Sequence, residues 1–146
     1  MPYCTIEDIK QLISEAELIQ LTDDNNVHLN IGIINSAISY AETTINSYLR
    51  SKYTLPLSET PELIKVFAVE LAIYRLHTRR MLLDMPDSLE NRYKNIINEL
   101  GKIQKGTVSL GIETPQEDLK LPDNNEYRTN KTYQDRIFSK EFLDRY

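Results

Sequence analysis

The fold is decided by residues 63–76, which read Leu63-Ile64-Lys65-Val66-Phe67-Ala68-Val69-Glu70-Leu71-Ala72-Ile73-Tyr74-Arg75-Leu76. Drawn as a helix, this stretch is apolar nearly all round. Such a helix is typical of the centre of a bundle or of a surface that neighbouring subunits cover. Thr60 and Pro61 predict where the helix starts, with Thr60 as the capping residue and Pro61 at the first helical position, where its missing N–H costs nothing.

Two further long amphipathic helices are predicted, one before and one after the central helix in the sequence. Residues 29–51 and residues 87–104 both carry apolar side chains at helical spacing. The apolar positions are Ile34, Ala37, Ile38, Ala41, Ile45, Tyr48 and Leu49 in the first, and Leu89, Tyr93, Ile96, Ile97, Leu100 and Ile103 in the second. Gly101 costs about 1 kcal/mol relative to alanine inside a helix, so we expect that end of the helix to be weak.

Two short helices are predicted at the N-terminus, because Thr5 and Ser14 stand at positions typical of helix caps. The expected fold class is therefore mainly α, a compact bundle of about four to five helices that forms a domain over residues 1–105. Pro86 is expected to separate the central helix from the last one.

The rest of the chain, residues 106–146, is predicted to form an extended, β-like arm and a C-terminal tail. The arm begins between Gly106 and Gly111 with β-prone residues such as Val108. Residues 112–135 carry too few apolar groups to order themselves alone. Apolar side chains then return at the end of the chain, which predicts that the tail docks on this subunit or on the next one. These residues are Ile137, Phe138, Phe142, Leu143 and Tyr146.

The composition argues against several classes of protein. The chain has 146 residues and a formal net charge of -5, whereas a protein whose affinity depends on DNA phosphates is normally basic. Its one cysteine, Cys4, leaves no internal disulfide framework and no cysteine-based zinc cluster. No run approaches the ~18 apolar residues of a membrane-spanning helix, and no secretory signal is visible. We therefore expect a protein made in a reducing cytoplasm, with no membrane partner.

No combination of residues in the sequence predicts an active site. His28 and His77 lie on separate predicted elements, and neither belongs to a His-x-x-x-His or Glu-x-x-x-His pair. The segment from Gly106 to Gly111 lacks the Gly-Lys-Ser/Thr ending of a phosphate-binding loop. We expect no catalytic residue, no metal site and no cofactor, and hence a protein that is not an enzyme.

Arg75, Arg79 and Arg80 form the strongest basic cluster of the sequence. One interpretation is structural, because cations are favourable near the C-terminal end of a helix. The functional alternatives are a contact with acidic groups of a partner and a transient, non-specific contact with passing DNA. The total charge favours protein acids, for instance those of residues 7–24 on a neighbouring copy, because residues 1–30 contain one lysine against six acidic residues.

Several stretches, taken in order, resemble a known family. They are Ala37-Ile38-Ser39-Tyr40-Ala41-Glu42, Ile45-Asn46-Ser47-Tyr48-Leu49, Tyr53-Thr54-Leu55-Pro56-Leu57, Ala72-Ile73-Tyr74-Arg75-Leu76-His77, residues 92–111 and the ending 136–143. This order is similar to that of the small Mu-like phage and prophage proteins of the head–tail junction.

The resemblance implies a helical connector whose copies close into a ring. It further implies docking between the portal protein of a phage head and the next tail-joining protein, so that a chain made in the bacterial cytoplasm ends in the virion. The family has no catalytic residues to carry over. The loop Leu55-Pro56-Leu57 and the segment after Gly106, with Val108 and Leu110, are expected at or near subunit contacts.

An alternative hypothesis is a small helical regulatory or DNA-binding module, such as an antitoxin. It rests on the cluster from Arg75 to Arg80 and on the short N-terminal helices. The net charge and the lack of a recognition helix with exposed basic groups argue against it.

Overall fold

The computed structural model describes residues 2–80 and 85–112 of the chain. In these residues the chain forms five helices and no strand, which confirms the mainly α class and the bundle. The helices are α1 (Ile6–Leu12), α2 (Glu15–Thr22), α3 (Ile31–Leu49), α4 (Glu62–Arg79) and α5 (Asp87–Gln104). None of the described helices combines the length and the apolar character that a membrane crossing requires.

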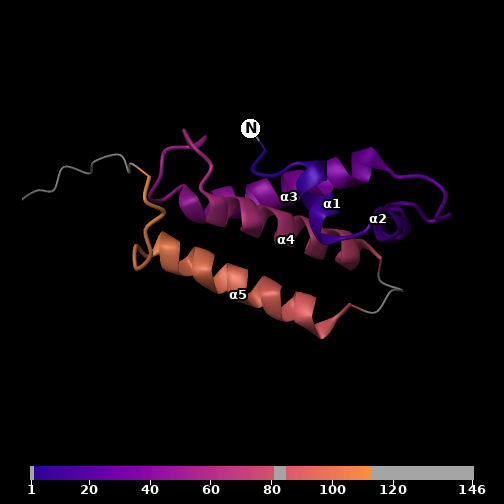
Figure 1. Ribbon diagram of the computed structural model, residues 1–146. Helices are drawn as coiled ribbons and strands as arrows, with labels where there is room; N and C mark the ends of the chain where they lie inside the picture. Colours follow the sequence, from indigo (N-terminus) through magenta and orange to yellow (C-terminus); the bar gives the residue numbers. More distant parts are fainter. Residues whose placement is uncertain (1, 81–84, 113–146) are drawn as a thin grey trace, which may run out of the picture. The chain divides into compact units, whose positions relative to one another are not determined.

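α4 lies at the centre of the bundle, as its sequence predicts. Figure 1 shows α3, α4 and α5 running side by side in alternating directions, with α1 and α2 packed near α3 and α4. Eight side chains of α4 are buried. They are Ile64, Phe67, Ala68, Val69, Leu71, Ala72, Ile73 and Leu76.

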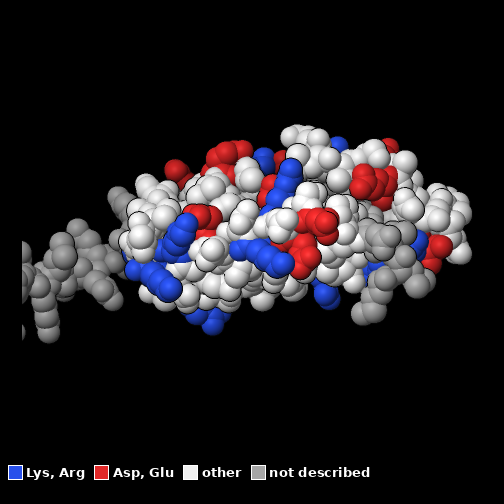
Figure 2. Space-filling view, turned by 90° about the horizontal axis from the view of Figure 1, so that it is seen from below, with Lys and Arg blue, Asp and Glu red and all other residues white. Residues whose placement is uncertain are grey.

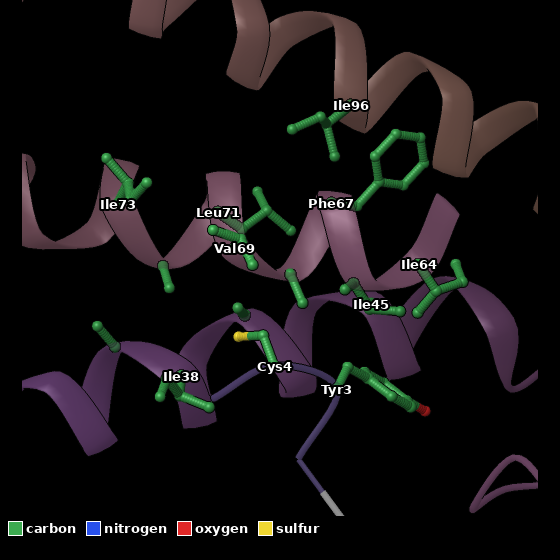
Figure 3. Packing of buried hydrophobic residues seen from close by; sticks show 14 of the residues in the cluster. Tyr3, Cys4, Ile38, Ile45, Ile64, Phe67, Val69, Leu71, Ile73 and Ile96 are labelled. Atoms are coloured by element: carbon green, nitrogen blue, oxygen red, sulfur yellow. The ribbon is translucent and has the colours of Figure 1, made fainter. Parts of the chain in front are cut away.

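The core is a continuous cluster of aliphatic and aromatic side chains from all five helices. In Figure 3, Phe67 of α4 and Ile96 of α5 lie toward each other, while Ile45 of α3 and Ile64 of α4 meet on the other side of α4. Cys4 belongs to the same cluster. Burial raises the pKa of its thiol to about 11, so the thiol stays protonated at neutral pH and fills space as a small apolar group.

The predicted caps of the two short helices are confirmed. Thr5 accepts a hydrogen bond from the Asp8 N–H and forms a full capping box with the Asp8 side chain, and Ser14 accepts from the Glu17 N–H. The predicted cap of the central helix is wrong by one residue. α4 begins at Glu62, and Pro61, with an extended backbone, takes the capping position that we expected Thr60 to hold.

The arm after α5 begins by folding back on the bundle. Gly106 adopts a positive φ of 79°, and the Thr107 N–H then bonds the Lys102 carbonyl oxygen at 3.0 Å. We had expected the segment to leave the bundle directly after Gly106. Instead, Val108 and Leu110 pack against the core. The arm forms no strand in the described residues, because its backbone N–H groups donate hydrogen bonds to the Tyr53 hydroxyl and to the Lys102 carbonyl oxygen at the end of α5.

Gly101 does not end α5, which continues to Gln104. A Cβ added at Gly101 would meet nothing within 4 Å. Gly101→Ala is therefore expected to raise the free energy of unfolding by about 0.5–1 kcal/mol, because alanine loses less backbone entropy in a helix. Denaturant unfolding measures the change. The matched control is Gly106→Ala, which should destabilise the protein, since Gly106 has a positive φ that side-chain-bearing residues rarely adopt. A Gly101→Ala variant that is less stable than the wild type would contradict this account.

Candidate partner-binding surfaces

The structure divides the predicted arginine cluster into two parts. Arg79 and Arg80 reach across to the turn after α2, where the Arg80 guanidinium donates to the Asp24 carboxylate at 2.6 Å and Arg79 Nη1 donates to the Leu21 carbonyl oxygen at 3.1 Å. The hydrogen bond from Arg80 and the charge of Arg79 hold the pKa of Asp24 below its ordinary value. An acidic residue from the N-terminal part of the same chain thus meets two of the three arginines for which we had considered a contact with a partner.

Arg75 contacts an aromatic ring rather than these acids. Its guanidinium carbon lies 5.0 Å from the centre of the Tyr40 ring, a cation–π contact, and no described carboxylate pairs with it. Beside it, a hollow of about 260 Å³ has Ile33, Ala37 and Leu76 among its lining residues. Arg75 therefore remains the candidate partner contact of the cluster.

The other predicted contact residues in the described part of the chain lie at one end of the bundle. Leu55 and Leu57 are half-buried against the core, and Pro56 between them is exposed. The arm joins this end through the Leu110 N–H, which donates to the Tyr53 hydroxyl at 3.1 Å. The structure thus brings together the loop and the arm. The remaining candidates lie outside the described residues; they are Phe138, Phe142 and Tyr146.

The surface also has a groove along α4, which the sequence analysis did not predict. It has a volume of about 320 Å³ and lies between the end of α1 and the start of α5. We call it the α4 groove. Its lining residues are Leu12 and Ile13 on the α1 side, Glu70, Ile73 and His77 on α4, and Pro86, Ser88, Leu89 and Arg92 on the α5 side.

Exposed apolar side chains continue the α4 groove toward the start of α4. Leu63 and Val66 are 43% and 44% exposed, and their spacing places them on the same face of α4 as Glu70, Ile73 and His77. Leu12 on the opposite wall is 56% exposed. The described bundle exposes five large hydrophobic side chains, and three of them, Leu12, Leu63 and Val66, lie in or next to the α4 groove.

The titratable and charged groups of the α4 groove are a histidine and an ion pair. Burial lowers the pKa of His77, although Glu17, 3.9 Å from its Nε2 atom, opposes the shift. The ring is thus neutral at neutral pH, and its buried Nδ1 atom has no hydrogen-bond partner in the described structure. Arg92 of α5 pairs with Glu70 of α4 at 3.4 Å. The groove therefore suits apolar side chains.

Charged side chains elsewhere on the bundle pair largely with one another. Figure 2 shows basic and acidic side chains side by side on the face that it presents. Lys94–Glu90 and Lys102–Glu99 are pairs within α5, and Lys65 of α4 binds Asp8 of α1 at 2.8 Å. No group of three His, Cys, Asp or Glu side chains in residues 2–80 and 85–112 is arranged to hold a metal ion.

Comparison with known proteins supports a phage origin for this bundle. A family model described as Bacteriophage Mu, Gp36 matches residues 3–129, which include every helix of the structure. The chain belongs to the bacteriophage Mu Gp36 family. The resemblance to Mu-like phage proteins that the sequence predicts is confirmed.

A curated relative supports the same assignment. This Gp36-family chain is 31% identical over 84 residues to the Mu-like prophage FluMu protein gp36 of Haemophilus influenzae. The alignment covers 58% of this chain and 57% of the relative. The chain thus spans a little over half the length of the curated relative that it matches.

Proposed function

We propose that this chain is a head–tail connector, a non-enzymatic assembly protein whose copies form a ring between the portal and the tail of a Mu-like phage or prophage particle. The observation that carries the proposal is an uncovered apolar surface in a member of a phage family, with Leu63 and Val66 of α4 and Leu12 of α1 exposed. Apolar surface of this kind is typical of a face that another protein covers.

The partners that follow are other copies of the chain, the portal protein and the next tail-joining protein. A contact between two different surfaces of one chain repeats from copy to copy and closes into a ring when the rotation permits. The arm, the loop around Pro56 and Arg75 are the described residues that we assign to such contacts. The protein is made in the bacterial cytoplasm, requires no cofactor, and enters the virion at the head–tail junction.

The structure gives less support to the alternative, a regulatory or DNA-binding module. That hypothesis depended on a free basic cluster from Arg75 to Arg80. Because Asp24 pairs with both Arg79 and Arg80, a single arginine of the cluster remains without an acidic partner among the described residues. We therefore place the connector function first.

Deleting residues 136–146 tests the connector function. The helical fold should persist, because every described helix ends at or before Gln104, whereas assembly should weaken at least tenfold, because the aromatic side chains of the tail are lost. Far-ultraviolet circular dichroism and thermal unfolding check the fold, and sedimentation of both chains over the same concentrations measures assembly. A truncated chain that assembles as well as the full-length chain would show that the tail plays no part.

A further inference from the structure

We propose that the α4 groove is the docking site for the C-terminal tail, residues 136–146, of a neighbouring copy. The proposal deepens the proposed function and rests on it, because it names the two surfaces that join one copy of the connector to the next. It commits to one occupant of the groove, the tail of a second copy.

The α4 groove has the length and the chemistry to hold a short amphipathic segment. The face of α4 that starts at the exposed Leu63 and ends at His77 in the groove spans 14 residue steps, or about 20 Å at 1.5 Å per residue. Its exposed and lining side chains are mainly aliphatic, with Leu63 and Val66 toward one end and Ile73 and Leu89 toward the other. A helix of 11 residues is about 16 Å long, which fits within this span.

The tail has the pattern that such a groove recognises. Phe138, Phe142 and Tyr146 are spaced four residues apart, which is typical of one face of a helix that inserts into a groove. The tail also carries charges of both signs, including Lys140 and Asp144, as does the groove, where Arg92 and Glu70 form an ion pair. The aromatic face would cover aliphatic side chains that the described structure leaves exposed.

The length of the chain between the bundle and the tail permits this contact. Ile112, the last described residue, packs against the core, and 23 residues (113–135) separate it from Arg136. Fully extended, they span at most about 80 Å, several times the length of the groove. The tail can therefore reach a neighbouring copy. A tail that filled its own groove would contribute nothing to assembly, and we therefore assign the groove to the tail of a second copy.

A complementation experiment with full-length chains tests this contact. The groove variant combines Leu12→Lys and Val66→Lys, two exposed positions where lysine does not disturb the core. The tail variant combines Phe138→Ser and Phe142→Ser. Each variant alone is expected to assemble at least tenfold more weakly than the wild type. An equimolar mixture should regain assembly as pairs of one copy of each, because an intact tail then meets an intact groove.

The matched control places lysine on exposed apolar residues away from the groove. Val27 and Ile31 are 60% and 55% exposed between α2 and the start of α3, and Val27→Lys with Ile31→Lys should assemble like the wild type. An excess of a synthetic peptide of residues 136–146 should dissociate the wild-type assembly, whereas a scrambled peptide should not. This measurement does not depend on the folding of a variant.

The outcomes separate the two proposals. Suppose that the wild type forms rings. If the groove variant then assembles equally well, the tail–groove contact is wrong and the connector function stands. The same conclusion follows if the mixture shows no complementation and the peptide has no effect. If the wild type stays monomeric at every concentration and with portal protein added, both proposals are wrong.

Discussion

Replacing Leu71 by alanine is expected to lower the free energy of unfolding by about 2–5 kcal/mol. Leu71 is fully buried in the middle of α4, the helix that packs against each of the other four helices. The substitution removes apolar contacts and leaves a cavity that the tightly packed helices fill only in part. Urea denaturation followed by circular dichroism measures the effect.

The control for Leu71→Ala is Leu63→Ala on the same helix. Leu63 is 43% exposed, so its truncation should cost less than about 1 kcal/mol in the isolated subunit. Equal losses of stability in the two variants would contradict the central position of α4. Because Leu63 lies on the face that we assign to the tail, Leu63→Ala should weaken assembly more than it weakens the fold.

Thr22→Val is expected to lower the free energy of unfolding by about 1–2 kcal/mol, although valine has nearly the same shape as threonine. Thr22 is the one buried polar side chain of the described core. Its hydroxyl donates to the Leu18 carbonyl oxygen at 2.7 Å and accepts from the Asn30 N–H at 3.3 Å, so it links the end of α2 to the start of α3. Valine leaves the Asn30 N–H without this partner.

Thr43→Val is the matched control for Thr22→Val. The exposed Thr43 hydroxyl bonds the Ser39 carbonyl oxygen of its own helix at 2.8 Å, and water can take its place. We expect a change within about 0.5 kcal/mol, measured by the same denaturation. A Thr22→Val variant as stable as Thr43→Val would show that the hydroxyl of Thr22 does not join α2 to α3.

The helices could be predicted from the sequence because apolar spacing and caps are local signals. The predicted range of α5 matches the observed one, from Asp87 to Gln104. α3 is two residues shorter at each end than predicted, because the Asn30 side chain caps it by accepting from the Ile33 N–H at 3.2 Å, and the prediction overlooked this cap. The start of α4 was misplaced because Thr60 has the residue type of a cap, whereas the backbone of Pro61 makes the first turn.

The surface was harder to predict because it depends on contacts between distant residues. Asp24 and Arg80 are 56 residues apart, and no local pattern indicates that they pair. The α4 groove could not be predicted for a related reason. In a stretch that is apolar all round, the sequence does not show which side chains the other helices leave uncovered, and Leu63 and Val66 are those residues.

The mass of the full-length chain, measured by analytical ultracentrifugation over a concentration series with and without portal protein, tests the central claim most directly. Self-association through two different surfaces predicts a monomer in dilute solution and a closed ring of one size when the chain is concentrated or when portal protein is present. A chain that keeps the mass of one subunit under all of these conditions would contradict the account.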